Sequence, residues 1–297
     1  MSRRSGCELS ECNMFSEVSV DQAVARAVEL AGSGRCVVLY ISLAPVLRHR
    51  DEVVSSPVTP GAGSPVGRLC QDEGVTAPEM SVDEAVARAV GLAGSGRRVV
   101  LGIVGAPGAG KSTLARRIVV AVDDALGAGT AVQVPMDGFH LSNAALDALG
   151  RHDRKGAIDT FDADGYVALV RRLVDGAPDG PVDGAPDGPV VWAPDFDRRV
   201  DEPVAGSIPV PPTARLVVSE GNYLLDDRAP WSALPDLFTE TWFCAVDDTI
   251  RVDRLVGRHM RHGRDHEAAR RWAVEVDGVN AARVARTVIR ASRTVRT

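Results

Sequence analysis

Residues 105–112 read GAPGAGKS, a full match to the phosphate-loop pattern GxxxxGK[ST]. Glycines in such a loop let backbone amides point at phosphate oxygens, the lysine reaches the β- and γ-phosphates, and the hydroxyl ligates Mg²⁺. An apolar strand is predicted before the loop and a helix after it, which is the setting that this chemistry needs. The alternative is a plain glycine-rich turn. The predicted nucleotide contacts are Gly105, Ala106, Pro107, Gly108, Ala109, Gly110, Lys111, Ser112 and Thr113.

Lysine is rare in this chain, and one of its few lysines lies in the loop. Of 34 basic residues, only Lys111 and Lys155 are lysines. Against an arginine background, a lysine indicates a place where a compact ammonium works and a planar guanidinium does not. Lys111 fits that expectation. Lys155 is a candidate on the same ground, with chance as the alternative.

Two acidic residues follow predicted strands. Asp137 lies in VPMDGFHLSN at 134–143, and Glu220 lies in RLVVSEGNYLL at 215–225. Ligands of an open parallel sheet bind at the carboxyl ends of its strands, so both carboxylates are expected beside the loop. Asp137 could then accept the proton of an attacking hydroxyl, and Glu220 could hold Mg²⁺ with Ser112. The alternatives are a simple turn for Asp137 and a surface acid for Glu220.

Three arginines recur at helical spacing in DRLVGRHMRHGRD at 253–265. Arg254, Arg258 and Arg261 share one helical face, from which they could close over phosphates as a lid and neutralise charge during transfer. A solvated basic face is the alternative. We expect Arg254 to contact the nucleotide and Arg258 to act in catalysis.

Several classes of protein are excluded by absent patterns. The NKxD motif of switch GTPases cannot occur, because neither lysine follows an asparagine, and no LSGGQ-like signature of transporter ATPases is present. The formal charge of −6 gives no general attraction to nucleic acid or anionic membrane, and no apolar run approaches a membrane span. We expect a cytoplasmic protein. A kinase and a nucleotide-gated regulatory ATPase remain as functions.

The periodicity of the chain predicts strands alternating with helices. The expected strands are 98–104, 130–135, 189–193, 215–219 and 240–246, and the expected helices are 111–126, 141–149, 163–174 and several from 248 onward. Such alternation predicts an α/β fold, a three-layer α/β/α P-loop NTPase with a mainly parallel sheet.

Two repeats bear on domain organisation. Residues 19–41 return as 81–103 with four differences, but only the second copy leads into the phosphate loop. We therefore expect residues 1–79 to be an N-terminal extension with a degenerate duplicate and a disordered linker, and 80–297 to be the kinase domain. Translation could start at Met80, or the first copy could be an interaction element. The second repeat, VDGAPDGP twice over 174–189, predicts a mobile surface loop.

Taken together, GIVGAPGAGKSTLA, VPMDGFHLSN, RKGAIDTFDADGY, VWAPDFDRRVDEPV, VVSEGNYLL and RLVGRHMRHGR resemble the phosphoribulokinase/uridine kinase family. The resemblance covers about 81–297 and is closest to its nucleoside/nucleotide kinase-like branch, related to bacterial pantothenate kinase. It implies a P-loop kinase fold, ATP and Mg²⁺ as cofactors, Asp137 as the base and an arginine-bearing lid. A small-molecule hydroxyl acceptor is the implied partner, with a homodimer left open.

The same resemblance implies where the acceptor binds. The acceptor residues carried over are Asp137, His140, Lys155, Phe196, Asp197 and Arg198, with Arg154, Asp159, Phe161, Asp162 and Pro194 in the same stretches. Related kinases usually carry Tyr-Asp and a downstream His where this chain has Phe196-Asp197 without one, so the acceptor itself is not identified. Asn280, in DGVNAARV, corresponds to an Asn-Ala motif near the nucleotide.

Overall fold

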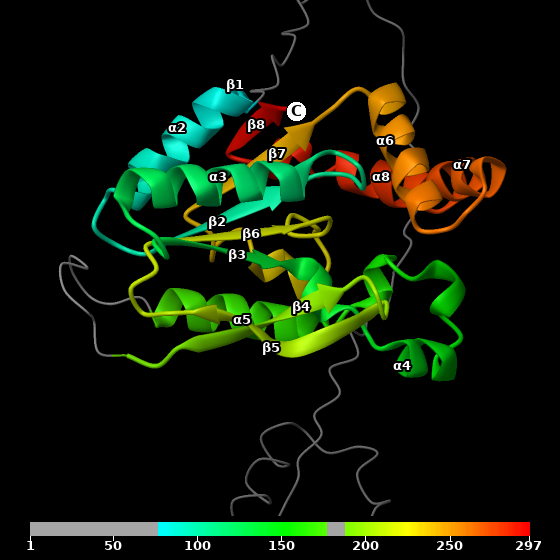
Figure 1. Cartoon of the computed structure of the whole chain (residues 1–297), viewed down its shortest axis with the longest axis horizontal. Helices are drawn as coiled ribbons and strands as arrows, with labels where there is room; N and C mark the ends of the chain where they lie inside the picture. The colour runs from blue at the N-terminus through cyan, green and yellow to red at the C-terminus, as the bar shows by residue number, and fades with distance from the viewer. Residues whose placement is uncertain (1–76, 177–187) are drawn as a thin grey trace, which may run out of the picture. The chain divides into compact units, whose positions relative to one another are not determined.

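A computed structural model describes residues 77–176 and 188–297 of the chain (Figure 1). The expectations for residues 1–76, and for the part of the second repeat at 177–187, lie outside the described residues. The described part holds no helix long and apolar enough to cross a membrane.

A six-stranded parallel sheet forms the centre of the fold. Its order is β1 (Glu79–Ser81), β8 (Arg293–Arg296), β7 (Glu240–Ala245), β2 (Val99–Val104), β6 (Leu216–Gly221) and β3 (Ala131–Pro135). All neighbouring pairs run parallel, and every residue of β2 and β6 is buried. Because both faces of these strands are covered, their sequences are continuous apolar runs rather than alternating patterns.

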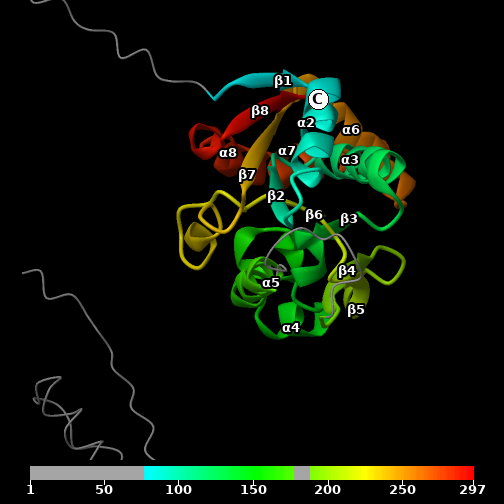
Figure 2. The same cartoon turned by 90° about the vertical axis from the view of Figure 1, so that its left-hand side faces the viewer.

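Helices cover both faces of the sheet (Figures 1 and 2). α2 (Val82–Ala93) and α3 (Lys111–Leu126) pack on one face, where alanines of α2 and apolar residues of α3 join the buried side chains of β2 and β6. α5 (Ala163–Asp175) packs on the other face, and α8 (Asp277–Ala285) contributes Val284 to the same cluster. The predicted three-layer α/β/α fold is confirmed.

Local sequence explains where these helices begin. Ser81 and Glu84 form a reciprocal capping box at the start of α2, and the Asp162 side chain accepts a hydrogen bond from the Gly165 amide at the start of α5. α3 differs, because its N-cap is Gly110 and no side chain caps it. Its first-turn amides are therefore left without a capping side chain.

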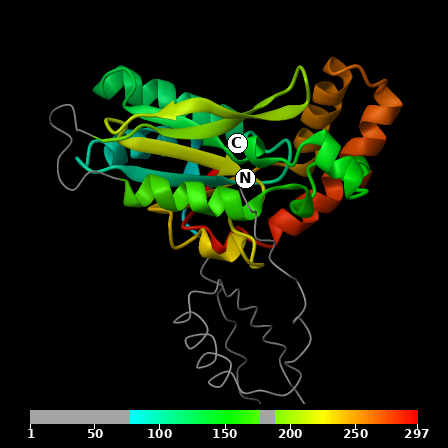
Figure 3. The same cartoon turned by 90° about the horizontal axis from the view of Figure 1, so that it is seen from below.

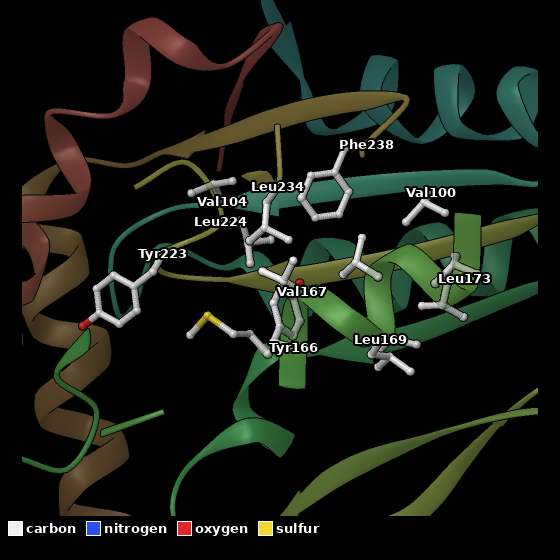
Figure 4. Packing of buried hydrophobic residues seen from close by; sticks show 14 of the residues in the cluster. Val100, Val104, Tyr166, Val167, Leu169, Leu173, Tyr223, Leu224, Leu234 and Phe238 are labelled. Atoms are coloured by element: carbon white, nitrogen blue, oxygen red, sulfur yellow. The ribbon is translucent and has the colours of Figure 1, made fainter. Parts of the chain in front are cut away.

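The core on the α5 side is built from aromatic and branched side chains. Tyr166, Val167, Leu169 and Leu173 of α5 belong to one buried cluster with Val100 and side chains of the neighbouring strands (Figure 4). The Tyr166 hydroxyl is fully buried and lies 2.6 Å from the Ser219 hydroxyl, and burial raises its pKa above the usual value. This hydrogen bond satisfies a polar group that would otherwise destabilise the core.

One predicted strand lies outside the parallel sheet. The segment expected at 189–193 is β4 (Val191–Asp197), which pairs antiparallel with β5 (Glu202–Val210) in a separate two-stranded sheet (Figure 3). β5 was not predicted. Its sequence, EPVAGSIPV, has two prolines and mostly exposed side chains, so it lacks the alternation that reveals a half-buried strand.

The remaining elements stand at the ends of the strands. α4 (Asn143–Ala148) and short 3-10 turns follow β3, whereas α6 (Asp248–Arg261) and α7 (His266–Glu275) follow β7. The predicted helix 111–126 matches α3 to the residue, and the helix expected at 141–149 is shorter. β1 and β8 were also missed, because three and four residues are too few to show a period.

Candidate active site

The candidate site lies at the carboxyl edge of the parallel sheet. β2 leads into the phosphate loop, β3 leads to Asp137, and β6 ends around Glu220. Since the three strands are adjacent and parallel, their carboxyl ends share one edge. One cleft of about 910 Å³ is lined by loop residues, Asp137 and Glu220 together. The structure therefore brings the two predicted carboxylates to the predicted loop.

The loop backbone has the shape of a phosphate cradle. Gly108 and Gly110 have φ of 82° and 88°, in the region that favours glycine. A Cβ at Gly108 would lie 2.9 Å from the Arg251 carbonyl oxygen and from Leu255 of α6. α3 begins at Lys111 directly after this turn, so its positive end and uncapped amides face the cleft. This arrangement fits a polyphosphate.

Lys111 is buried within the loop. Its ammonium donates to the Ala106 carbonyl at 3.1 Å and to Asn222 Oδ1 at 2.8 Å. Burial lowers the pKa of this lysine, and the nearby carboxylates of Glu220 and Asp137 partly oppose the shift. Sequence reasoning missed Asn222. Its only signal was its position two residues after Glu220, at the same strand end.

Ser112 and Glu220 form a second contact across the site. The Ser112 hydroxyl donates to Glu220 Oε1 at 2.8 Å, and the Gln133 amide reaches the same oxygen at 3.3 Å. Burial raises the pKa of Glu220, and the charge of Asp137 raises it further, while Lys111 opposes them. Gln133 was also missed, because a polar residue inside a strand reads as an outward-facing position.

This pair of oxygens fits a Mg²⁺ ion better than a protein-only metal cage. Among the described residues there is no group of three or more His, Cys, Asp or Glu that could hold a metal. Mg²⁺ keeps several waters and is commonly bound through one or two protein oxygens plus substrate phosphates. Ser112 and Glu220 offer such oxygens at the mouth of the cradle.

Asp137 sits in a 3-10 turn, Met136–Phe139, that follows β3. Its Oδ2 accepts a hydrogen bond from Arg198 Nη2 at 3.1 Å. The next residue, Gly138, packs against the hairpin, and a Cβ there would lie 2.4 Å from the Pro194 carbonyl oxygen. Only glycine therefore fits between this turn and β4.

All three predicted lid arginines line the cleft. Arg254, Arg258 and Arg261 come from α6. The Arg254 guanidinium lies near Gly110 of the loop, 3.6 Å from where a Cβ would stand. Burial lowers the pKa of Arg258. The positive charge of Arg258 also lies close enough to Lys111 to lower the pKa of that lysine. Figure 1 shows α6 and α7 at the strand end where this cleft lies.

The opposite wall is aromatic. The His140 ring lies 4.1 Å from Phe161 and 4.8 Å from Phe196 between ring centroids. His140 Nδ1 is 2.8 Å from the Asp137 carbonyl oxygen, which can only accept, so Nδ1 carries the proton. Burial lowers the pKa of His140, which favours the neutral ring. All three rings line the cleft.

Lys155 is held at the same wall. Its ammonium donates to Asn143 Oδ1 at 2.6 Å, forms an ion pair with Asp201 at 2.9 Å, and lies 5.0 Å from the Phe196 ring centroid. These contacts satisfy its charge within the protein. Asn280 is buried nearby, with its amide 3.5 Å from the Gly156 carbonyl, so it lies beside the predicted acceptor segment.

Some predicted acceptor residues point elsewhere. Asp197 is not among the residues that line the cleft, and its carboxylate pairs with Arg199 at 2.6 Å, which lowers its pKa to about 2. Arg154 and Asp159 form an ion pair with each other. Asp162 caps α5. Of that longer set, Phe161 faces the cleft.

Another part of the cleft wall carried no sequence signal. His259 Nε2 lies 2.8 Å from Asp277 Oδ2, and both side chains are largely buried. The Arg264 guanidinium stacks 3.7 Å from the Trp272 ring centroid. These residues come from α6, α7 and α8 and the turn between them, so only the packing of three helices brings them together.

The chain is similar to several known proteins. It is 36% identical over 197 residues to a Schizosaccharomyces pombe protein named "Putative uridine kinase", covering 64% of this chain and 78% of that protein. It is 36% identical over 152 residues to "ATP-dependent kinase-like protein notR'" of Aspergillus versicolor, covering 49% and 84%.

A solved structure, titled as a putative fructose transport system kinase from Silicibacter sp. TM1040, has a TM-score of 0.61 and 33% identity. The match covers 72% of this chain and 98% of that one. No protein-family profile matches the chain.

Proposed function

Because this chain belongs to the P-loop kinases of the phosphoribulokinase/uridine kinase family, we propose that it transfers the γ-phosphoryl group of Mg-ATP to a hydroxyl of a small metabolite. One observation carries the proposal most directly. The phosphate loop, the Ser112–Glu220 pair and Asp137 line a single cleft, although they come from three different strand ends. A phosphotransferase needs these three parts in one place.

Binding of the nucleotide rests on the loop. The amides at the start of α3 hold the phosphate oxygens, and Lys111 leaves its Asn222 contact or shares it to reach the β- and γ-phosphates. Arg254 lies beside the loop and closes over the same phosphates. Ser112 and Glu220 would hold a Mg²⁺ ion beside the loop, and the ion would supply positive charge that offsets the charge of the phosphates.

The chemical step uses Asp137. Its carboxylate accepts the proton of the acceptor hydroxyl while that oxygen forms a bond to the γ-phosphorus. The bond from the γ-phosphorus to the β–γ bridging oxygen breaks, and ADP leaves with that oxygen. Lys111 and Arg258 stabilise the charge on the transferring group, because both lie near Asp137 in a largely buried setting.

The acceptor occupies the aromatic side of the cleft. His140, with its protonated Nδ1 held by the backbone, offers an unprotonated Nε2 that accepts from a hydroxyl of the acceptor. Phe161 and Phe196 flank that ring and exclude water. Lys155 supports the wall through its contacts to Asn143 and Asp201. Sugars, nucleosides and vitamin precursors are the acceptor classes to screen.

The competing function is a nucleotide-gated ATPase without an acceptor. The aromatic part of the cleft beside Asp137 favours the kinase. An ATPase that only couples hydrolysis to a conformational change does not need an aromatic pocket next to its base.

The test is a coupled ADP-release screen over hydroxyl-bearing metabolites with two variants of the full chain. Asp137→Asn is expected to lose most acceptor-dependent turnover, roughly 10²–10⁴-fold, while ATP still binds. Lys111→Ala is expected to lose both turnover and ATP affinity. Nucleotide binding is measured separately by fluorescence titration.

Either of two results would overturn the proposal. One is turnover retained in Asp137→Asn, which would remove the base. The other is slow ADP release that no metabolite stimulates, which would favour the regulatory ATPase.

A further inference from the structure

Arg198 connects the β4–β5 hairpin to Asp137. It lies in the loop between the two strands, outside the parallel sheet that carries the rest of the site. Among the described residues, no other basic side chain forms an ion pair with Asp137. Arg198 is half-exposed and Asp137 less so, and both line the cleft. A cation from a separate element thus touches the proposed base.

The contact leaves half of the carboxylate free. Arg198 binds Oδ2 through Nη2, whereas Asp137 Oδ1 has no hydrogen bond within the described structure. A carboxylate held by one oxygen cannot rotate freely about its Cβ–Cγ bond. Its other oxygen is then left available to a hydroxyl bound in the cleft that both residues line.

The hairpin end that carries Arg198 is itself anchored. The Glu202 carboxylate accepts hydrogen bonds from the Asn143 backbone N–H at 3.0 and 3.1 Å, and Asp201 pairs with Lys155 at 2.9 Å. On the other strand, the Pro194 carbonyl packs on Gly138. These contacts all join the hairpin to the segment that follows Asp137. Asp137 and Arg198 are therefore held in one packed unit.

We propose that Arg198 is a positioning residue for Asp137, which holds Oδ2 and leaves Oδ1 to receive the proton of the acceptor hydroxyl. The inference rests on the proposed role of Asp137 as the base. It differs from a direct role for Arg198 in binding the acceptor, because Arg198 acts here through the carboxylate. The two roles predict different kinetics and different behaviour in a double variant.

The first test compares Arg198→Ala, Arg198→Lys and Arg199→Ala in the full chain. Loss of the contact between Arg198 and Asp137 is expected to lower kcat roughly 10- to 100-fold with little change in KM for ATP or acceptor. The reason is that a misoriented Asp137 carboxylate slows the chemical step but does not weaken substrate binding. Arg198→Lys keeps the charge and restores part of kcat. Non-denaturing guanidinium ion added to Arg198→Ala is expected to raise kcat, which a purely structural role would not allow.

Arg199→Ala is the matched control. Arg199 is the next residue in the same loop, but it pairs with Asp197 and does not line the cleft. Its removal is expected to leave kcat unchanged. If Arg199→Ala lowered kcat as much as Arg198→Ala does, any substitution in this loop would lower kcat, and the proposal would be overturned.

The second test is the double variant Asp137→Asn/Arg198→Ala. If Arg198 acts through Asp137, then adding Arg198→Ala to a chain that already carries Asp137→Asn costs at most about twofold more. A full additional loss, or an Arg198→Ala effect confined to the acceptor KM, would assign Arg198 to the substrate and overturn the inference while the kinase function stands. Undiminished turnover in Asp137→Asn alone would instead contradict the proposed base.

Discussion

Ser112 and Glu220 illustrate how the site is prepared at the scale of single residues. Their hydrogen bond places two hard oxygens together, but the carboxylate is buried next to Asp137. Burying a charge destabilises a fold unless it is paired. Lys111 offsets part of this effect. The Glu220 carboxylate would therefore be best stabilised by a bound cation. Without that cation it lowers the stability of the fold, which is a common cost of a functional site.

Replacing Glu220 should separate its proposed role as a contact of Mg²⁺ from its effect on the stability of the fold. The pKa of Glu220 is raised in the fold, so its contribution to stability is present below its unfolded pKa and is lost as pH rises through the folded pKa. Glutamine does not ionise, so Glu220→Gln removes this loss of stability at higher pH. We expect the metal-free variant to melt at a higher temperature than the parent at neutral pH, by about 2–4 °C for each kcal/mol, with turnover largely abolished.

Thermal melts without Mg²⁺ at several pH values check this prediction. The difference in melting temperature between variant and parent should grow as pH rises from about 4.5, the ordinary Glu value, towards neutral. A difference of the opposite sign, or one independent of pH, would mean that Lys111 already compensates the charge in full.

At the scale of elements, the hairpin is fitted to the turn that carries Asp137. The contact between Gly138 and Pro194 is backbone on backbone, so no side-chain movement can relieve a larger residue. The same hairpin supplies Phe196 and Arg198 to the cleft. The base and the acceptor wall therefore depend on the docking of an element that is not part of the main sheet.

Gly138→Ala should disturb this docking. The new Cβ would lie 2.4 Å from the Pro194 oxygen, and the turn or the strand must move. Overpacking of this kind costs about 1–3 kcal/mol. We expect a lower melting temperature and a loss of acceptor-dependent turnover that exceeds the loss of ATP binding, measured by melting, steady-state kinetics and nucleotide titration.

Gly91→Ala is the matched control for that substitution. Gly91 lies in α2 with nothing within 4 Å of a new Cβ, and alanine favours a helix over glycine by roughly 0.5–1 kcal/mol. This variant should be neutral or slightly more stable. If Gly138→Ala behaved in the same way, the close approach of turn and hairpin would be of no consequence.

At the scale of the whole described fold, the sheet is completed by its two smallest strands. β1 pairs with β8, Met80 is buried against α2, and the Thr294 amide donates to the Pro78 carbonyl at 3.0 Å. Ser81 ends β1 and caps α2 at the same time. The edge of the sheet is therefore formed by the residues directly before the second copy of the repeat together with its first residue, Ser81.

Shortened chains test this edge. A chain that begins at Ala77 keeps every described contact, and we expect it to retain turnover, as the predicted role of the first 79 residues as an extension implies. A chain that begins at Val82 loses β1, the buried Met80 and the Ser81 cap, with a cost of about 1 kcal/mol for the cap alone. Melting temperature and ADP release of both are compared with the full chain. Equal behaviour of the two shortened chains would show that β1 is dispensable.

The sequence by itself determined the fold class, the phosphate loop and the approximate positions of Asp137, Glu220 and the lid arginines. These features are local, since a loop between an apolar strand and a helix, or an acid at a strand end, is written in consecutive residues. Parallel strands then bring their carboxyl ends together whatever their order. Placing Lys111, Asp137 and Glu220 in one cleft needed no more than that.

Only the tertiary structure decided the partners of those residues. Asn222 and Gln133 contact Lys111 and Glu220 across strands, Arg198 reaches Asp137 from 61 positions away, and β5 has no pattern of its own. Such contacts depend on how elements pack, and packing is not encoded in the spacing of neighbouring residues. Asp197, next to Phe196 on β4 but paired with Arg199, shows how one step along a strand turns a side chain away from the cleft.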